Sequence, residues 1–220
     1  MIVSIDGGAA TGKSATAKIL SEKMNFIHLN SGLIYRALTY ILIKEKCLNK
    51  SSLFYEKYLS NLNLNIEGEK LNSIIYENHD ISNNLYTQQI SDNIKHISNN
   101  KLIREYVTSI QRKLSENNNV VCEGRDIGSV VFPHADIKFF LKCNIEERVR
   151  RRYDQFFKNN IIVDKKKLKK KILNRDNNDM NRKNSPLKIT DDSIVIDTTS
   201  MTLDNVIKIM CEKIKDKYVK

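Results

Sequence analysis

Four residues near the start of the chain have types and a spacing suited to binding phosphate. Gly7, Gly12, Lys13 and Ser14 fit the pattern of a glycine, four residues, then glycine, lysine and serine or threonine. Glycines let backbone N–H groups surround an anion, because no side chain stands in the way. A lysine at this point reaches the β- and γ-phosphates, and the hydroxyl that follows binds Mg²⁺. We therefore predict a site for a nucleoside triphosphate, with Ser14 as a metal ligand, over Gly7, Gly8, Ala9, Ala10, Thr11, Gly12, Lys13 and Ser14.

Arginines recur along the chain at points where segments end. Arg125 and Asp126 stand between Gly124 and Gly128, directly after an apolar run. Transfer of a phosphoryl group needs positioned substrates and cations that neutralise charge, rather than a covalent catalyst. A surface ion pair at a turn is the simpler interpretation of Arg125 and Asp126. The other candidate cations are Arg36, Arg148, Arg151, Arg152, Arg175 and Arg182.

These candidates have structural interpretations as well. Arg148, Arg151 and Arg152 are predicted to share one face of a helix, on which Glu147 and Arg151 have the spacing of a simple i,i+4 pair. Ser31 has the residue type of a helix N-cap.

Apolar runs alternate with helical patterns along most of the chain. This alternation predicts an α/β fold, a doubly wound parallel sheet with helices on both faces. Ligands of such sheets bind at the carboxyl ends of the strands, which is where residues 7–14 fall. The predicted strands are residues 2–6, 26–29, 120–123, 137–141 and 193–197, and the predicted helices are residues 13–24, 32–46, 101–116, 145–157 and 203–217.

Residues from about 50 to 100 break this alternation. The runs 63–66 and 71–76 flank residues 67–70 and are typical of a β-hairpin. A polar helical stretch follows over about 86–98. We interpret the segment as an insertion at the edge of the core.

The chain carries a formal charge of +11, from 37 Lys and Arg against 26 Asp and Glu. This charge suits an anionic partner, either a nucleotide or a nucleic acid. The lysine-rich run 165–171 contains Leu168, which with Ile172 forms an apolar helical stripe, so we favour a solvated basic face over a nucleic-acid site.

No segment approaches the roughly 20 apolar residues of a membrane span. We expect a cytoplasmic monomer without nucleic-acid or membrane partners.

Five segments make the chain resemble a known family, the bacterial cytidylate kinases. These are P-loop nucleoside monophosphate kinases that phosphorylate CMP and dCMP. The resemblance runs from the first strand to the last helix. Its most specific part is the Gly-Arg-Asp-x-Gly sequence that runs into Val-Val-Phe-Pro. The segments are residues 7–14, 31–36, 123–133, 175–182 and 193–198.

The resemblance implies a P-loop kinase fold with ATP and Mg²⁺ as cofactors. It implies a core over about 1–30, 103–147 and 161–220 and a monophosphate-binding insertion over about 31–102. The clustered arginines before a polar stretch indicate a small lid over about 148–160. CMP or dCMP would lie between core and insertion. Lys13, Arg125, Arg151 and Arg152 would be catalytic. Arg36, Arg125 and Arg182 would hold the CMP phosphate, Arg175 and Asp179 the ribose, and Ser31, Arg104 and Asp126 the cytosine.

An ionised Asp126 would suit cytosine because it accepts hydrogen bonds and cytosine offers a 4-amino donor. Uracil presents an acceptor there, and an unpaired buried group costs about 1–3 kcal/mol. Three positions depart from the family pattern: Asn30 replaces an aspartate, Tyr86 an arginine, and Lys95 a small hydroxyl residue.

Three other functions remain alternatives at this point. One is a P-loop kinase for UMP, AMP, dTMP or a non-nucleotide acid. Another, from a different class, is a nucleic-acid-binding NTPase, and a third is a nucleotide switch without catalysis.

Overall fold

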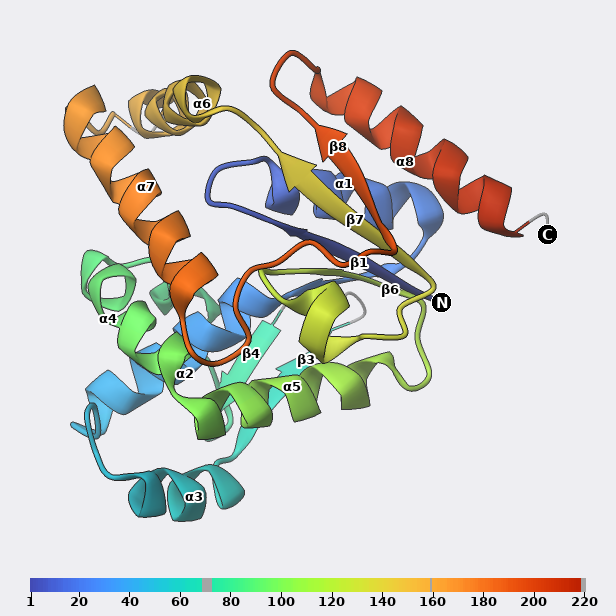
Figure 1. The fold of residues 1–220 in the computed structure, drawn as a ribbon. Coiled ribbons are helices and arrows are strands. Elements are labelled where there is room, and N and C mark those ends of the chain that lie inside the picture. Colours follow the sequence, from blue (N-terminus) through green and yellow to red (C-terminus); the bar gives the residue numbers. More distant parts are fainter. Residues whose placement is uncertain (69–72, 159, 219–220) are drawn as a thin grey trace. The chain divides into compact units, whose positions relative to one another are not determined.

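The computed structural model describes residues 1–68, 73–158 and 160–218 (Figure 1). Backbone contacts divide the chain into two units. The first consists of Met1–Phe26 with Asn119–Lys220, and the second of Ile27–Asn118. Each unit has its own hydrophobic core.

The first unit is built on parallel strands. β1 lies between β6 and β7, and β8 pairs with β7 on its other side. The strands consist mainly of apolar residues that the sheet buries, as expected for a parallel sheet covered by helices. The predicted runs 120–123 and 193–197 are confirmed at both ends, and the other two strands end one residue later than predicted. The bounds are β1 (Ile2–Gly7), β6 (Val120–Glu123), β7 (Ile137–Lys142) and β8 (Ser193–Asp197).

Two helices, α1 (Lys13–Met24) and α8 (Leu203–Tyr218), pack against each other and share a core with the sheet. Helix α1 begins after Gly12, whose φ of 97° is accessible to glycine at little cost. Its residue Leu20 is fully buried, as is Ile207 of α8. Parallel strands flanked by helices confirm the predicted α/β class.

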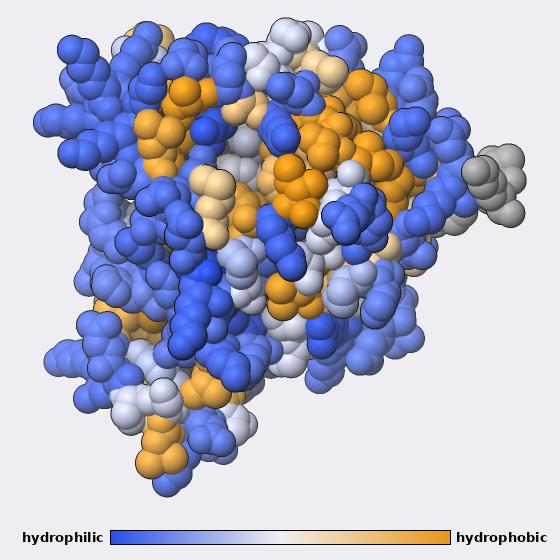
Figure 2. All heavy atoms as spheres, in the orientation of Figure 1, coloured by the Kyte–Doolittle hydropathy of each residue, from blue (hydrophilic) through white to orange (hydrophobic). Residues whose placement is uncertain are grey.

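The remaining elements of the first unit are η2 (Ile127–Val131), a π-helical turn, and the helices α6 (Ile145–Lys158) and α7 (Lys165–Asn181). Leu168 and Ile172 of α7 are buried and confirm the predicted apolar stripe. The lysines of the run are exposed. Figure 2 shows that much of the visible face of the molecule is hydrophilic.

The C-terminal end of α7 requires a correction. The spacing of Arg175, Asp179 and Arg182 predicts one helix that continues to Ser185-Pro186. The helix instead ends at Asn181, and Arg182 has an extended backbone with ψ of 143°. The backbone therefore leaves the helix direction after Arg182, and Ser185 and Pro186 are not part of the helix.

The second unit packs around α2. The buried residues Ile34, Ala37, Leu38, Ile41 and Leu42 follow the three- and four-residue spacing of one helix face. Each large side chain among them contributes roughly 1.5–3 kcal/mol by its burial. Helices α4 and α5 pack on α2. The bounds are β2 (Ile27–Asn30), α2 (Ser31–Lys44), α3 (Ser52–Ser60), α4 (Gln88–Asn99) and α5 (Lys101–Ser115).

A small antiparallel sheet lies in the predicted insertion. β3 (Leu64–Glu67) pairs with β4 (Ser73–Tyr76), which confirms the two hairpin strands. The turn was predicted at 67–70, but Glu67 belongs to β3. Residues 69–72, which comprise the second half of that turn and the first two residues of the second predicted run, lie outside the described part of the chain. The sequence did not predict α3, β5 (His79–Asp80) or the 3₁₀ turn η1 (Ser82–Asn84).

We expect Gly7→Ala to destabilise the protein by about 3 kcal/mol. A Cβ at this position would lie 2.4 Å from the backbone oxygen of Leu141, and φ is +150°. The matched variant is Gly128→Ala, whose Cβ would meet side-chain atoms of Ser4 and Lys138 at 3.0 and 3.1 Å. Side chains move more readily than a paired strand, so urea unfolding should show a smaller loss of unfolding free energy for Gly128→Ala than for Gly7→Ala. Equal losses for the two variants would contradict this account.

Candidate functional site

The predicted phosphate loop connects β1 to α1. The buried ammonium group of Lys13 donates to the backbone oxygen of Gly8 at 2.5 Å and to Thr11 Oγ1 at 3.3 Å. Burial lowers the pKa of Lys13, and the charge of Arg125 lowers it further, while Glu123 acts in the opposite direction. A bound polyanion would stabilise the charged form of this lysine. The loop thus has a cation suited to the phosphates that its sequence predicts.

A carboxylate that the sequence reasoning missed lies beside the loop. Ser14 Oγ donates to Glu123 Oε2 at 2.8 Å. Glu123 is buried at the end of β6, where it is opposite Ile5 of β1. A hydroxyl and a carboxylate are the oxygen ligands that Mg²⁺ accepts, so the pair fits that ion. The sequence did contain a signal for this residue, because Glu123 is a charged residue at the end of an apolar run.

No group of three or more His, Cys, Asp or Glu side chains that could hold a metal occurs within the described residues. Mg²⁺ commonly takes one or two carboxylates and completes its shell with substrate phosphates and water. The Ser14–Glu123 pair is therefore compatible with a magnesium ion that arrives with a nucleotide.

Asp6, the second buried carboxylate at a strand end, holds the turn that follows Arg125. Its two oxygens accept from the backbone N–H groups of Ile127 and Gly128 at 2.9 and 2.7 Å. The side chain is almost fully buried, and this burial raises its pKa to about 6. Asp6 thus connects β1 to η2. It was not among the predicted site residues.

Four of the predicted substrate residues form one ion-pair network in the first unit. Arg125 Nε donates to Asp179 Oδ2 at 2.9 Å. Arg182 lies 3.4 Å from Asp126 Oδ1 and 3.9 Å from Asp179 Oδ1, and it also donates to the backbone oxygen of Ser185 at 2.7 Å. The network combines two guanidinium groups, which suit a phosphate, with two carboxylates that fix them. The interpretation of Arg125 and Asp126 as an exposed surface pair is therefore wrong.

Arg175 lies on α7, one turn before Asp179. Its side chain is exposed, and its charge contributes to lowering the pKa of Lys13. The structure thus brings Arg175 within electrostatic reach of the phosphate loop.

The three arginines predicted on one face of α6 have different surroundings. Arg148 is buried and donates to the backbone oxygen of Ala9 at 3.1 Å. Arg151 pairs with Glu147 at 2.8 Å, as its spacing predicts, and its NH1 donates to Thr198 Oγ1 at 3.1 Å. Arg152 is exposed.

Arg152 is held within its own helix. It lies over the ring of Phe156, 5.0 Å from the centroid, and donates to Gln155 Oε1 at 2.9 Å. The structure therefore brings Arg148 and Arg151 to the loop but does not bring Arg152 there. Residue 159, within the predicted lid 148–160, lies outside the described residues.

Ser31, Arg36 and Arg104 belong to the second unit. Asn30, not Ser31, is the N-cap of α2, because its Oδ1 accepts from the N–H of Leu33 at 3.2 Å. This corrects the N-cap interpretation of Ser31, whose hydroxyl accepts from Gln111 Nε2 of α5 at 2.7 Å. Gln111 is almost completely buried, and nothing in its sequence context distinguished it.

The two predicted site arginines of this unit donate to backbone carbonyls. Arg36 donates to the oxygen of Leu85 at 3.0 Å and lies over the ring of Tyr86, 5.1 Å from its centroid. Arg104 is buried, donates to the oxygen of Ser98 at 2.9 Å, and lies over the Tyr35 ring. Both contacts fix a guanidinium group beside an aromatic ring. Lys95, one of the three predicted departures from the family pattern, is exposed.

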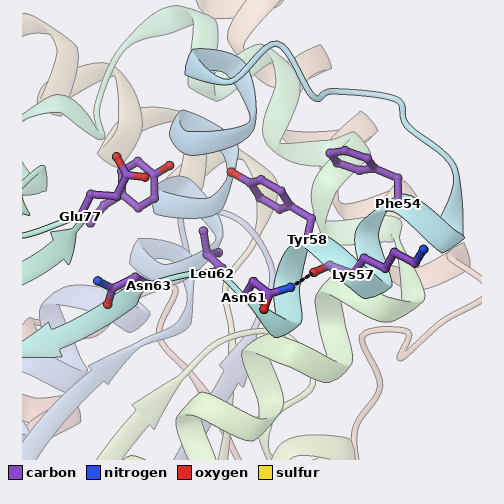
Figure 3. A pocket seen from close by; sticks show the side chains of 8 residues that line it. Phe54, Lys57, Tyr58, Asn61, Leu62, Asn63 and Glu77 are labelled. Carbon is purple, nitrogen blue, oxygen red and sulfur yellow. Dashed lines mark hydrogen bonds between the residues drawn. The ribbon is translucent and has the colours of Figure 1, made fainter.

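A cavity of about 450 Å³ lies elsewhere in the second unit (Figure 3). Phe54 and Tyr58 in its wall are stacked with centroids 5.4 Å apart. None of the predicted site residues lines it. In the first unit, a cavity of about 350 Å³ borders the phosphate loop at Gly8 and Thr11.

Comparisons with known proteins cover nearly the whole chain. A family model described as cytidylate kinase matches residues 3–216. A cytidylate kinase of Fusobacterium nucleatum is 38% identical over 217 residues, which are 98% of this chain and 97% of that protein. A cytidylate kinase of Oceanobacillus iheyensis is 38% identical over 205 residues, 93% of this chain and 89% of that one.

Solved structures support the fold alone. An uncharacterized protein from Eubacterium ventriosum has a TM-score of 0.53 at 12% identity, with 98% of each chain covered. The protein TT1252 from Thermus thermophilus has a TM-score of 0.50 at 15% identity, with 97% of each chain covered.

Asp6 gives a prediction about pH. Its folded-state pKa of about 6 lies above the ordinary 3.8, so between these values only the unfolded chain has released the proton. Its contribution to stability is therefore complete below pH 4 and is lost as the pH rises through 6, by about 3 kcal/mol in total. Urea unfolding of the protein and of Asp6→Asn between pH 4 and 7 measures this difference. A difference that does not change with pH would show that Asp6 does not titrate in this range.

Proposed function

Because the chain belongs to the cytidylate kinase family, we propose that residues 7–14 bind ATP and that the arginine network after β6 binds the acceptor phosphate. The chain transfers the γ-phosphoryl group of ATP to CMP or dCMP, giving ADP and CDP or dCDP. The observation that carries the site proposal is the 2.8 Å hydrogen bond from Ser14 of the phosphate loop to Glu123, which lies two residues before Arg125. The phosphate loop and the turn that contains Arg125 therefore follow the paired ends of β1 and β6.

The donor site follows from the phosphate loop. We propose that Lys13 releases its bond to Gly8 and pairs with the β- and γ-phosphates. Ser14 and Glu123 would hold Mg²⁺ through their oxygens, which lie 2.8 Å apart. The ion would supply positive charge that neutralises part of the charge of the phosphates.

The ion-pair network of the first unit supplies several of the proposed acceptor residues. Arg125 and Arg182 are already oriented by Asp179, and we propose that they bind the phosphate of CMP with Arg36. Asp126 would accept from the cytosine amino group, with Arg182 fixing its other side. The complete proposed set is Arg36, Arg125 and Arg182 for the phosphate, Arg175 and Asp179 for the ribose, and Ser31, Arg104 and Asp126 for the base.

The chemistry requires positioning and charge neutralisation. The acceptor is a phosphate oxygen that is already anionic, so we assign no general base. Lys13 and Arg125 would stabilise the charge that develops around the transferred group. Arg151, held by Thr198 next to the loop, is placed to add to them, and Arg152 would do so only after leaving Phe156. Closure of residues 148–160 over the site would exclude water.

We further propose that the protein acts as a cytoplasmic monomer without nucleic-acid or membrane partners. In the part of the chain that the structure describes, no helix is both long and apolar enough to span a bilayer. Gel filtration tests the monomer.

The acceptor preference tests the proposed function. We expect ADP formation from Mg-ATP with CMP and dCMP, and little with UMP or AMP. Asp126→Asn should lower kcat/KM for CMP by about 10- to 100-fold and reduce the CMP-to-UMP ratio, because an amide also offers a donor to uracil. Asp216→Asn, an exposed carboxylate on α8, is the matched control. Efficient use of UMP by the unaltered protein would place the error in base recognition near Lys95, and activity independent of any acceptor would overturn the function.

The phosphate loop gives a second prediction. Lys13→Ala should lower kcat by about 100- to 1,000-fold, since it removes a cation from the transferred phosphate. CMP binding in the absence of ATP should change little. Lys18→Ala removes an exposed lysine of the same helix and should behave like the unaltered protein. An unchanged kcat for Lys13→Ala would refute the assignment of the loop.

A further inference from the structure

Two buried charged side chains, Arg148 of α6 and Asp176 of α7, bind one peptide of the phosphate loop. Asp176 Oδ1 accepts from the N–H of Ala9 at 2.7 Å. Arg148 NH1 donates to the backbone oxygen of Ala9 at 3.1 Å and also to Asp176 Oδ2. Both side chains are less than one tenth exposed. The donor and the acceptor of Ala9 are therefore both bound by an ion pair from segments about 140 and 167 positions away.

The neighbouring loop residues are in close contact with the same helices. Ala9 is buried in a small apolar cluster with Val149 of α6, and Ala10 packs against that cluster. A Cβ on Gly8 would lie 3.0 Å from Arg148 NH1 and 3.1 Å from Asp176 Oδ1. A methyl group at Gly8 would therefore require the Arg148 and Asp176 side chains to shift by a few tenths of an ångström.

The contacts of α6 and α7 with the loop hold a strained backbone conformation at Ala10. Its φ is +59°, in the left-handed region that an alanine adopts only at a cost of about 1–2 kcal/mol. Such a conformation persists where surrounding contacts determine it. The ion pair fixes the residue directly before it, and the apolar cluster holds both alanines. Without the pair, Ala10 would relax toward negative φ and turn the amides that follow.

We infer that Arg148 and Asp176 are positioning residues for ATP, which hold the phosphate loop in its nucleotide-binding shape. The inference rests on the proposed ATP site over residues 7–14. It assigns the start of α6, which the sequence places in a lid, to the anchoring of the loop. Because the same two side chains join α6 to α7, the anchor also sets where these helices meet the loop.

Asp176→Asn tests the pair, because the amide keeps the shape but loses the charge that holds Arg148. We expect KM for ATP to rise about tenfold, with KM for CMP within about twofold of the unaltered value. Glu146→Gln is the matched control. It removes an exposed ion pair between the same two helices, Glu146 with Lys169 at 2.8 Å, which does not contact the loop. Its KM for ATP should remain within about twofold of the unaltered value.

A second variant, Ala10→Gly, distinguishes a positioning role of the ion pair from a purely structural one. Glycine adopts a positive φ at little cost, so the loop would depend less on the anchor. We therefore expect Asp176→Asn to raise KM for ATP less in the Ala10→Gly background than in the unaltered chain. A fluorescent ATP analogue, titrated without any acceptor, should give the same order of affinities.

The outcomes separate the inference from the proposed function. A lowered melting temperature for Asp176→Asn with unchanged KM values would overturn the positioning role and leave the kinase intact. An equal rise in KM for ATP in both backgrounds would also overturn it. Failure of the unaltered protein to phosphorylate CMP, with ATP binding retained, would refute the function instead.

Discussion

The need to neutralise buried cations is the constraint on which the first unit depends. Lys13 is buried, and the side chains of Arg125 and Arg182 are largely so. Removing such ions from water costs several kcal/mol each unless opposite charges and hydrogen bonds surround them. The carboxylates that do so come from the end of β6, from the turn after it and from α7. Elements far apart in sequence must therefore meet at the carboxyl ends of the strands.

The buried charges at these strand ends divide into two kinds. Some act on the backbone: Asp6 binds the first amides of η2, and Arg148 with Asp176 binds both polar groups of Ala9. Others face the groups proposed to meet phosphate, as Asp179 does toward Arg125. The first kind makes the loops rigid enough for the second to be precise. Electrostatic stabilisation of a transition state depends on such rigidity, because dipoles that must reorganise contribute less.

The sequence predicted most of the elements because local patterns determine them. The apolar runs at β6 and β8 and the helix after Gly12 were correct at both ends, since propensity, burial and turn chemistry agree there. Helix α7 ended earlier than its spacing suggested. The missed residues Asp6, Glu123 and Asp176 act through partners more than 100 positions away, a distance at which no periodicity carries information. Gln111 was missed for the same reason, because only the packing of α5 on α2 brings it to Ser31.

Because the two units have separate cores, each unit can tolerate amino-acid substitutions without disturbing the packing of the other. The cluster around Ile34 and Leu38 lies in the second unit, and that around Ile5 and Phe139 lies in the first. Effects of substitutions at sites without shared partners add almost independently. Residues near Ser31 and Arg104, the proposed base contacts of the second unit, can therefore change while the packing under the phosphate loop stays intact. Substitutions can accumulate in the core of one unit without endangering the packing of the other.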